Sequence, residues 1–450
     1  MSPASMSADP AKLDHRHLWH PFTQQREWAG EEPLMIERAE GTTLVATDGR
    51  RYIDGVSSLW CNVHGHRHLG IDRALRDQLG RVSHTTMLGL SHPGAAELAA
   101  RLVAIAPPGL SRVFYSDSGS TATEVALKMA FQYWQQRGGQ HVRRTSFVHL
   151  RDAYHGDTVG AVSVGGIDAF HAAYGPLLFR SHAAEPGDAA DMARILEANE
   201  EEVAAVIVEP LVQGAAGIRV HRPGYLRAVR ELCNRHGVLL ICDEVATGFG
   251  RTGTMFACEQ ERVAPDLLCV AKGLTGGYLP LAATLASERI YVGFLGAPEE
   301  QRTFFHGHTY TGNPLACAAA LANLDAFERE RTLLRLQPKI RLLAELLDEV
   351  EAMPEVAEVR GRGFIAGIDL GAHDPAVRLG HRVTLEARRR GAIVRPLGDV
   401  VVLMPPLAIS KGELRRLVAI TREAVKAAHA DAYGARPGRG TAAAPLAEAA

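Results

Sequence analysis

Two short apolar runs of this chain each lead into a single ionisable side chain. The run at residues 239–242 precedes Asp243, and the run at residues 267–271 precedes Lys272. In an open α/β sheet, ligands bind just beyond the carboxyl ends of the strands, so this carboxylate and this amine can converge on one ligand. Such a pair suits pyridoxal phosphate, which requires a lysine to hold its aldehyde as a Schiff base and an acid beside its pyridine nitrogen.

Asp243 and Lys272 each also have another interpretation. An ionised Asp243 in so apolar a setting needs a cation, either a protonated pyridine nitrogen or a buried basic residue such as Arg251. A desolvated Lys272 would have a lowered pKa and act as a nucleophile. A lysine at a strand end that reaches solvent is the commoner arrangement.

A turn rich in small residues, Ser-Asp-Ser-Gly-Ser at 116–120, joins a predicted strand to a predicted helix. Gly119 allows the backbone to approach a ligand closely, and the free N–H groups of the first helical turn can bind a phosphate. Ser120 can add a hydroxyl group. The alternative is an ordinary Ser/Asp helix cap.

Two further candidates follow apolar runs. Tyr154 lies in the segment 151–158 and either stacks on a flat ring or is a buried tyrosine of a turn. Glu209 ends a predicted strand at 204–208 and is either a site residue or a capping acid, because a buried carboxylate needs partners.

Other classes of site are not supported by the spacing of reactive residues. Histidines cluster at 64–68 and 306–308, but neither cluster has the two-histidine-plus-carboxylate helical spacing of a zinc enzyme, so we expect no metal. The six cysteines form no C-x-x-C pair, which argues against a disulfide scaffold. The chain also lacks the G-x-S-x-G elbow of serine hydrolases.

The elements that must position these residues alternate between helix and strand. Such alternation predicts an α/β fold with a mostly parallel, doubly wound sheet. We expect a hairpin at 44–53, strands at 112–115, 204–208, 238–242 and 267–270, and helices at 95–105, 120–134 and 225–235. Long helices at 312–329 and 333–350 lead to a smaller unit with strands near 364–370, 393–395 and 400–403 and a closing helix.

We expect five parts in the chain. These are a disordered N-terminus at 1–14, an N-terminal segment of a small domain at 15–65, a large cofactor-binding domain at 66–330, the C-terminal part of the small domain at 331–430, and a disordered Gly/Ala-rich tail at 431–450.

The composition is that of an ordinary globular protein, with 46% apolar and 22% charged residues. A formal net charge of −2 shows no electrostatic footprint for nucleic acid or an anionic membrane. No apolar run reaches the roughly 18 residues of a membrane span, and residues 1–14 contain no apolar segment of the secretory type. We therefore expect a cytoplasmic enzyme that acts on small molecules.

Taken together and in this order, the motifs resemble the class III, fold-type I aminotransferases over about residues 15–430. Besides the turn at 116–120, the matching segments are Tyr-His-Gly-Asp-Thr at 154–158, the block at 243–253, and Lys-Gly-Leu-Thr-Gly-Gly at 272–277. The resemblance implies a pyridoxal 5'-phosphate-dependent transferase with a large domain around the doubly wound sheet and a smaller α+β domain built from both chain ends.

The resemblance also implies roles for the candidate residues around the cofactor. Lys272 would be the Schiff-base lysine, and Asp243 would hold the pyridine nitrogen. Gly119 and Ser120 would bind the phosphate, and Tyr154 would stack on the ring.

Residues elsewhere in the chain would complete the site. Thr309, with His308, would reach the phosphate of the neighbouring subunit's cofactor, which implies a homodimer with shared sites. Arg395 would clamp the substrate carboxylate, a contact for which a guanidinium group is well shaped. Gly307, and with it Leu59 and Trp60, would line the substrate pocket.

The opening motif at 17–23 and the segments Arg-Pro at 395–396 and Met-Pro-Pro at 404–406 are similar to the biotin-pathway branch of the family. This implies ping-pong transamination of 8-amino-7-oxononanoate to 7,8-diaminononanoate, with S-adenosylmethionine or L-lysine as amino donor. The alternatives are another ω-amino acid or diamine transaminase that uses pyruvate or a 2-oxo acid, and a catalytically silent member of the fold, which would have lost Lys272 or Asp243.

Three departures from the commoner pattern of that branch all lie where the amino donor is expected. Leu59 stands in place of the first of two adjacent tryptophans, and Phe22 stands in place of a frequent tyrosine. His308 and Tyr310 stand in place of proline and phenylalanine. These departures are similar to a branch that takes lysine, so the sequence supports the amino acceptor better than the donor.

Overall fold

The computed structural model describes residues 9–434 and contains a large domain built on a seven-stranded sheet. Four neighbouring pairs of strands are parallel, and only β12 runs antiparallel to its neighbours. The strand order is β4 (Leu110–Ser116), β12 (Ala282–Ser287), β11 (Leu267–Val270), β10 (Leu239–Asp243), β7 (Val203–Val208), β5 (Ser146–Leu150) and β6 (Ser181–Ala184). This arrangement confirms the expected mostly parallel sheet.

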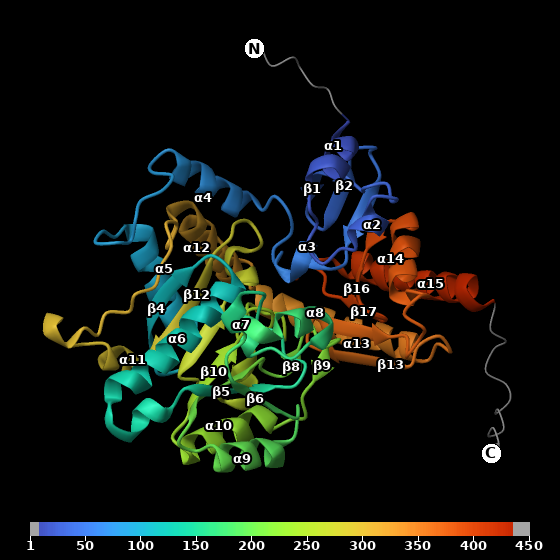
Figure 1. The fold of residues 1–450 in the computed structure, drawn as a ribbon. Helices are drawn as coiled ribbons and strands as arrows, with labels where there is room; N and C mark the ends of the chain where they lie inside the picture. The colour runs from blue at the N-terminus through green and yellow to red at the C-terminus, as the bar shows by residue number, and fades with distance from the viewer. Residues whose placement is uncertain (1–8, 435–450) are drawn as a thin grey trace, which may run out of the picture.

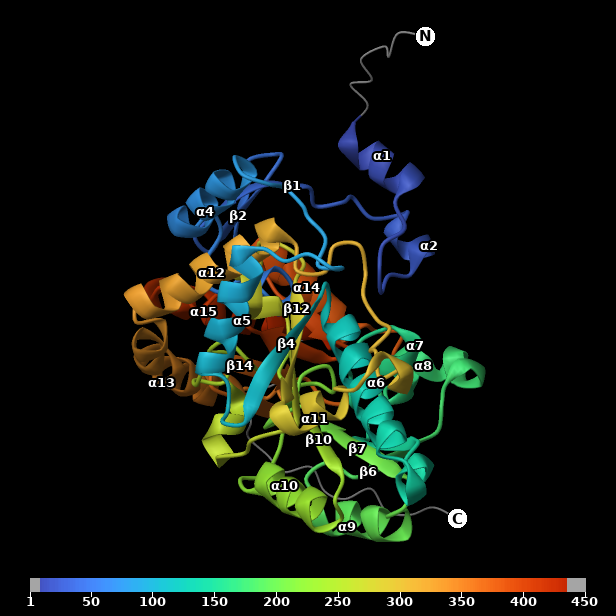
Figure 2. The same cartoon turned by 90° about the vertical axis from the view of Figure 1, so that its left-hand side faces the viewer.

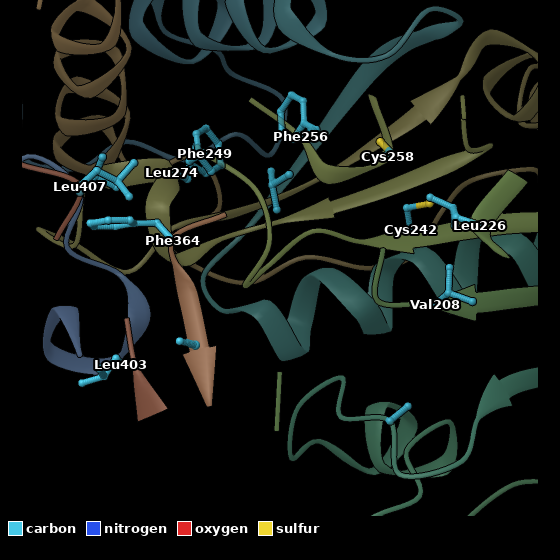
Figure 3. Packing of buried hydrophobic residues seen from close by; sticks show 14 of the residues in the cluster. Val208, Leu226, Cys242, Phe249, Phe256, Cys258, Leu274, Phe364, Leu403 and Leu407 are labelled. Carbon is cyan, nitrogen blue, oxygen red and sulfur yellow. The ribbon is translucent and has the colours of Figure 1, made fainter. Parts of the chain in front are cut away.

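Helices cover both faces of this sheet, which explains why its central strands are continuously apolar. Alternate residues of β10 enter different core clusters: Ile241 packs with residues of α6 (Gly119–Arg137), and Cys242 packs with residues of α10 (Tyr225–Arg235). Figure 3 shows Cys242 close to Leu226 of α10. Figure 2 shows α5 (Pro93–Ile105) and α6 on opposite sides of β4 and β12.

The predicted elements of this domain are all present, with bounds that differ by a few residues. Three strands of the seven-stranded sheet were not predicted individually, namely β5, β6 and β12. Strand β12 is composed of small residues, Ala-Ala-Thr-Leu-Ala-Ser, so it lacks the large apolar side chains that mark a buried strand in a sequence. The remaining elements of the domain are α4 (Leu69–Leu79), α7 (Val159–Ser163), α8 (Asp168–His171), α9 (Ala189–Ala198), α11 (Glu288–Gly293), α12 (Pro314–Arg329), β8 (Val212–Gln213) and β9 (Arg219–Val220).

The small domain is built from both ends of the chain, as expected (Figure 1). Strand β3 (Arg51–Asp54) of the N-terminal segment pairs in parallel with β15 (Ala392–Ile393) of the C-terminal segment. Its two sheets have the orders β1-β2-β3-β15 and β13-β14-β17-β16. The other elements are α2 (Gln25–Trp28), α3 (Ser57–Trp60), β1 (Ile36–Glu40), β2 (Thr43–Ala46), α13 (Thr332–Glu351), β13 (Glu358–Arg362), β14 (Ile365–Asp369), α14 (Leu379–Arg389), β16 (Arg395–Leu397), β17 (Val400–Leu403) and α15 (Lys411–Tyr433).

The structure corrects the expected disorder near both ends. Residues Pro10–His17 form α1, because Asp9 accepts a hydrogen bond from the Ala11 N–H and Pro10 occupies the first turn. Helix α15 continues to Tyr433, three residues beyond the expected end of the small domain. The rest of the expected disordered ends, at 1–8 and 435–450, lies outside the described residues. Among the helices of residues 9–434, none is both long and apolar enough to cross a membrane.

Candidate active site

A cavity of about 740 Å³ lies at the carboxyl ends of the central strands of the large domain. Asp243 is the last residue of β10, and Lys272 follows β11, which is the next strand of the sheet. The cavity brings together six of the predicted site residues, which are Trp60, Gly119, Ser120, Tyr154, Asp243 and Lys272. Residues from both domains therefore meet at the edge where an open α/β sheet binds its ligands.

The buried carboxylate of Asp243 is held in one orientation by two hydrogen bonds. Its Oδ2 accepts a hydrogen bond of 2.7 Å from Nδ1 of His155, and its Oδ1 accepts one of 3.0 Å from the Val245 N–H. Arg251 does not contact it, because that guanidinium donates to the Pro405 carbonyl and to Oγ of Ser57. The alternative in which Arg251 neutralises Asp243 is therefore wrong.

Lys272 has the environment expected of a reactive amine. Burial lowers the pKa of its amine, and the negative charge of Asp243 is the largest opposing influence. Its Nζ lies 5.5 Å from the centre of the Trp60 ring. The backbone at Lys272 has φ +36°, a conformation that non-glycine residues rarely adopt.

The first turn of α6 forms the second part of the cavity wall. Ser118 caps this helix by accepting the Thr121 N–H, so the cap predicted as an alternative is present one residue before Gly119. The following N–H groups of Gly119 and Ser120 lie in the first turn, where no intrahelical acceptor is available. A side chain at Gly119 would place Cβ 2.6 Å from the Val245 side chain, so only glycine fits.

Tyr154 and Glu209 are neighbours in the cavity wall. The Tyr154 hydroxyl donates a 2.7 Å hydrogen bond to Asp157, and its N–H donates to Glu209. Glu209 also accepts the Gly214 N–H at 2.8 Å and lines the cavity, so its buried carboxylate has two backbone partners. Burial raises the pKa of Glu209 to about 7.

The segment Ser57–Trp60 approaches the cavity from the small domain in a strained conformation. Ser57, Ser58 and Trp60 all have positive φ angles. Asp54 stabilises this turn by accepting the N–H of Ser58 at 2.8 Å, and the Ser57 hydroxyl donates to the Met404 carbonyl at 2.7 Å. This contact connects the segment to Met-Pro-Pro at 404–406.

Five predicted site residues do not line this cavity. Leu59 is 49% exposed, although its neighbour Trp60 lines the wall. Gly307, His308 and Thr309 line a separate cavity of about 1110 Å³ beside β4 and α5. Arg395 lies on β16, where burial lowers its pKa and Tyr154 is the one group that opposes this shift.

The histidine cluster at 64–68 makes contacts that stabilise the domain. His66 bonds to Asp54 at 3.0 Å, and His68 bonds to Glu330 at 2.6 Å. Within residues 9–434, no group of three or more potential ligands has the geometry to hold a metal ion.

Several cavity residues were not predicted to belong to the site, among them His155, Asp157, Thr158 and Cys61. His155, Asp157 and Thr158 lie in the same short motif as Tyr154, and that motif was the signal available in the sequence. Cys61 directly follows Trp60 and lines the cavity with it. Each is close in the sequence to a predicted site residue, but only the folded structure shows which side chains of a motif line the cavity.

Chemically, the cavity combines an amine of lowered pKa, an oriented carboxylate, the first turn of a helix and an aromatic side chain. These groups suit a flat cationic ring that carries an aldehyde and a phosphate, because the helix start binds the anion and the carboxylate faces the cation. Two buried ring nitrogens of its lining residues, Nε1 of Trp60 and Nε2 of His155, have no hydrogen-bond partner among the described residues. A bound polar ligand would provide partners for such groups.

Comparisons with known proteins agree with this chemistry. The Aminotransferase class-III family matches residues 25–425. A relative from Nitratidesulfovibrio vulgaris, named adenosylmethionine-8-amino-7-oxononanoate aminotransferase, is 57% identical over 94% of this chain and 82% of its own length. A relative of the same name from Geobacter sulfurreducens is 50% identical over 90% of this chain and 94% of its own.

Two solved structures are similar over almost the whole chain. The crystal structure of adenosylmethionine-8-amino-7-oxononanoate aminotransferase from Methanocaldococcus jannaschii has a TM-score of 0.91 and 43% identity, covering 93% of this chain and 98% of the other. An amine transaminase from an uncultivated Pseudomonas species, solved in its PLP-bound form, has a TM-score of 0.85 and 38% identity, covering 92% and 99%.

Proposed function

Because this chain belongs to the Aminotransferase class-III family, we propose that it transfers an amino group to 8-amino-7-oxononanoate, giving 7,8-diaminononanoate for biotin synthesis. The observation that supports this most directly is the meeting of Lys272 and Asp243 in one cavity at the carboxyl ends of adjacent strands. The names and high identities of the relatives support the choice of amino acceptor.

The cofactor is pyridoxal 5'-phosphate, and the residues of the cavity fit it. When bound, it supplies an aldehyde that exchanges amines and a pyridinium ring that withdraws electrons from the substrate carbon. Asp243 faces the cavity with both oxygens already oriented, so it can accept a hydrogen bond from the ring nitrogen without rearranging. The free N–H groups of Gly119 and Ser120 at the start of α6 would bind the phosphate.

Lys272 is the amine that would hold the aldehyde and then move a proton at the substrate carbon. Its lowered pKa increases the fraction of neutral amine available to accept that proton at neutral pH. Tyr154 would stack on the ring, with its hydroxyl fixed by Asp157. The half-reaction with the amino donor and the half-reaction with the amino acceptor would use the same lysine and the same cavity. The two substrates would therefore react one after the other, in a ping-pong sequence.

Arg395 would bind the carboxylate of the amino acceptor. In the described part of the chain its guanidinium group makes no hydrogen bond or ion pair. The group is partly buried, and this burial lowers its pKa. An unpaired and partly buried guanidinium group is unfavourable unless an anion binds there. Tyr154 is close enough to influence its charge, so a ligand beside Tyr154 would also be near Arg395.

The working unit would be a homodimer in which each subunit completes the other's site. Gly307, His308 and Thr309 lie apart from the cavity of their own subunit, beside an apolar surface on which Leu88 is 89% and Phe305 82% exposed. Large apolar side chains exposed together mark an interface. A second copy seated there would allow Thr309 and His308 to reach its cofactor phosphate.

We assign S-adenosylmethionine as the amino donor because the relatives' names state it. Leu59 and His308 are the positions through which L-lysine would be accepted instead. The reaction would take place in the cytoplasm, which is consistent with six cysteines that form no disulfide.

A single-turnover experiment tests donor and acceptor separately. S-adenosylmethionine and L-lysine are each added to the cofactor-loaded enzyme, and the loss of its visible absorbance is followed. Conversion by S-adenosylmethionine supports the assignment, whereas conversion by lysine alone means that Leu59 and His308 have altered the donor site. The aminated enzyme is then mixed with 8-amino-7-oxononanoate or pyruvate, and a faster return of absorbance with pyruvate would contradict the proposed acceptor.

Lys272→Ala provides the chemical control. It should abolish turnover and prevent borohydride from attaching the cofactor covalently to the protein, as read by mass spectrometry. Full turnover by this variant would overturn the proposed role of Lys272.

A further inference from the structure

We infer that Thr158 is a positioning residue of the phosphate site, acting through the hydroxyl of Ser120. The two residues are 38 positions apart in the sequence, yet their hydroxyl oxygens lie 3.0 Å apart in the wall of the cavity. The inference rests on the proposed placement of the cofactor phosphate at Gly119 and Ser120.

The hydrogen bonds of Ser120 leave its hydroxyl few choices. A hydroxyl has one proton and two acceptor lone pairs. The Thr158 N–H donates to Oγ of Ser120 at 3.0 Å and occupies one lone pair. When the Thr158 hydroxyl donates as well, both lone pairs are occupied, and the Ser120 proton must point elsewhere.

The remaining direction for that proton is toward the cavity, which both side chains line. A phosphate at the start of α6 would therefore meet an O–H group that is already turned toward it. Preorganisation of this kind increases affinity because the rotation of the hydroxyl does not have to be restricted on binding.

The backbone is shaped for this contact. Gly156 has φ +120°, and a Cβ at this position would lie 2.1 Å from Oγ of Ser120. Glycine at 156 thus lets the segment 154–158 pack directly on the first turn of α6. The same segment carries Tyr154, so the close packing at Gly156 sets the position of the proposed stacking ring relative to the first turn of α6.

The segment is also anchored independently of the Thr158 side chain. The N–H groups of Gly160 and Ala161 both donate to Oε1 of Glu124, at 2.7 and 3.2 Å. The Thr158 N–H bond to Ser120 does not depend on the hydroxyl. Thr158→Val keeps the branched shape and these anchors, so it removes the hydroxyl without removing what holds the segment in place.

The test is a double-mutant cycle read by cofactor affinity. Pyridoxal phosphate is titrated into cofactor-free wild type, Thr158→Val, Ser120→Ala and the double variant, and binding is followed by absorbance. We expect Ser120→Ala to weaken affinity roughly 10- to 100-fold and Thr158→Val about five- to tenfold. Thr158→Val should cost less than about twofold in the Ser120→Ala background, because coupled residues are not additive.

Three controls separate positioning from a general structural effect. Thr158→Ser, which keeps the hydroxyl, should restore affinity. Pyridoxal, which lacks the phosphate, should bind Thr158→Val as it binds wild type. Thr421→Val removes a buried threonine hydroxyl that donates only to the Leu417 carbonyl in α15, and it should leave affinity unchanged.

The other possible results contradict either the phosphate placement or the role of Thr158. Unchanged affinity in Ser120→Ala would refute the proposed phosphate placement, and the inference with it. A loss in Ser120→Ala without one in Thr158→Val would refute only the inference. An equal loss from Thr158→Val in both backgrounds, or weaker binding of pyridoxal, would mean that Thr158 does not act through Ser120 on the phosphate.

Discussion

Nδ1 of His155 donates a 2.7 Å hydrogen bond to Oδ2 of Asp243, and both side chains are buried. An ionised carboxylate only accepts hydrogen bonds, so the proton of this contact lies on the imidazole nitrogen. His155 therefore fixes the orientation of Asp243 and provides the buried carboxylate with a polar partner. His155, and not Arg251, is therefore the polar partner of Asp243.

His155→Phe should reduce turnover by roughly 10-fold to 100-fold while leaving Asp243 in place. The reason is that Asp243 would lose the donor that orients it and would be held only by the Val245 N–H. His155→Asn retains an N–H donor and should lose less. The measurement is kcat at saturating cofactor for both variants, and equal losses in the two would contradict a role for the hydrogen bond.

Glu209 should make stability depend on pH. Because its pKa is raised to about 7, the folded protein binds more protons than the unfolded chain between about pH 4.5 and 7. The free energy of unfolding contributed by Glu209 therefore falls as pH rises through this window. Glu209→Gln has no such titration. The free energy of unfolding of wild type, taken relative to that of the variant, should therefore fall by roughly 1–3 kcal/mol from pH 5 to pH 8.

This prediction is measured by urea denaturation of the cofactor-free protein at several pH values. Glu201→Gln is a matched control, because the Glu201 side chain is 68% exposed and pairs with Arg143 on the surface. A difference between wild type and Glu209→Gln that does not change with pH would contradict the raised pKa.

Arg395→Lys should raise the KM for 8-amino-7-oxononanoate by about 10-fold to 100-fold, with a smaller effect on kcat. Lysine keeps the positive charge but cannot form the paired hydrogen bonds of a guanidinium group with a carboxylate. The same substitution at Arg143, which lies in an exposed ion pair, should leave both constants unchanged. An unaltered KM for Arg395→Lys would remove Arg395 from the substrate site.

The shared site of the dimer predicts complementation between two inactive or weakened variants. Lys272→Ala and Thr309→Ala are produced together with different tags, and the mixed dimer is isolated. One of its two sites then combines an intact Lys272 with an intact Thr309 from the partner. We expect about half the wild-type activity at limiting cofactor, which neither parent dimer would reach.

Activity of the mixed dimer no higher than the residual activity of Thr309→Ala would show that Thr309 serves the site of its own subunit. Sedimentation of the wild type under the same conditions checks that a dimer is present.

Much of the fold follows from patterns that are local in the sequence. Strands β7, β10 and β11 were predicted to within one residue, because a continuous apolar run between turns specifies a strand buried on both faces. The prediction failed for β12, where small residues carry no such pattern and the neighbouring strands β4 and β11 decide the pairing. Near the N-terminus, the Asp9-Pro10 helix start outweighed a polar composition that had suggested disorder.

The sequence by itself determined which chemical groups end the central strands, Asp243 and Lys272, because each strand's residues alone define where it stops. Only the tertiary structure decided which partners those groups meet. His155 lies 88 residues from Asp243, and Arg251 was an equally reasonable partner by composition. The positions of Leu59, Arg395 and 307–309 likewise depend on how distant segments pack, because a side chain's neighbours across a fold are set by packing and not by spacing along the chain.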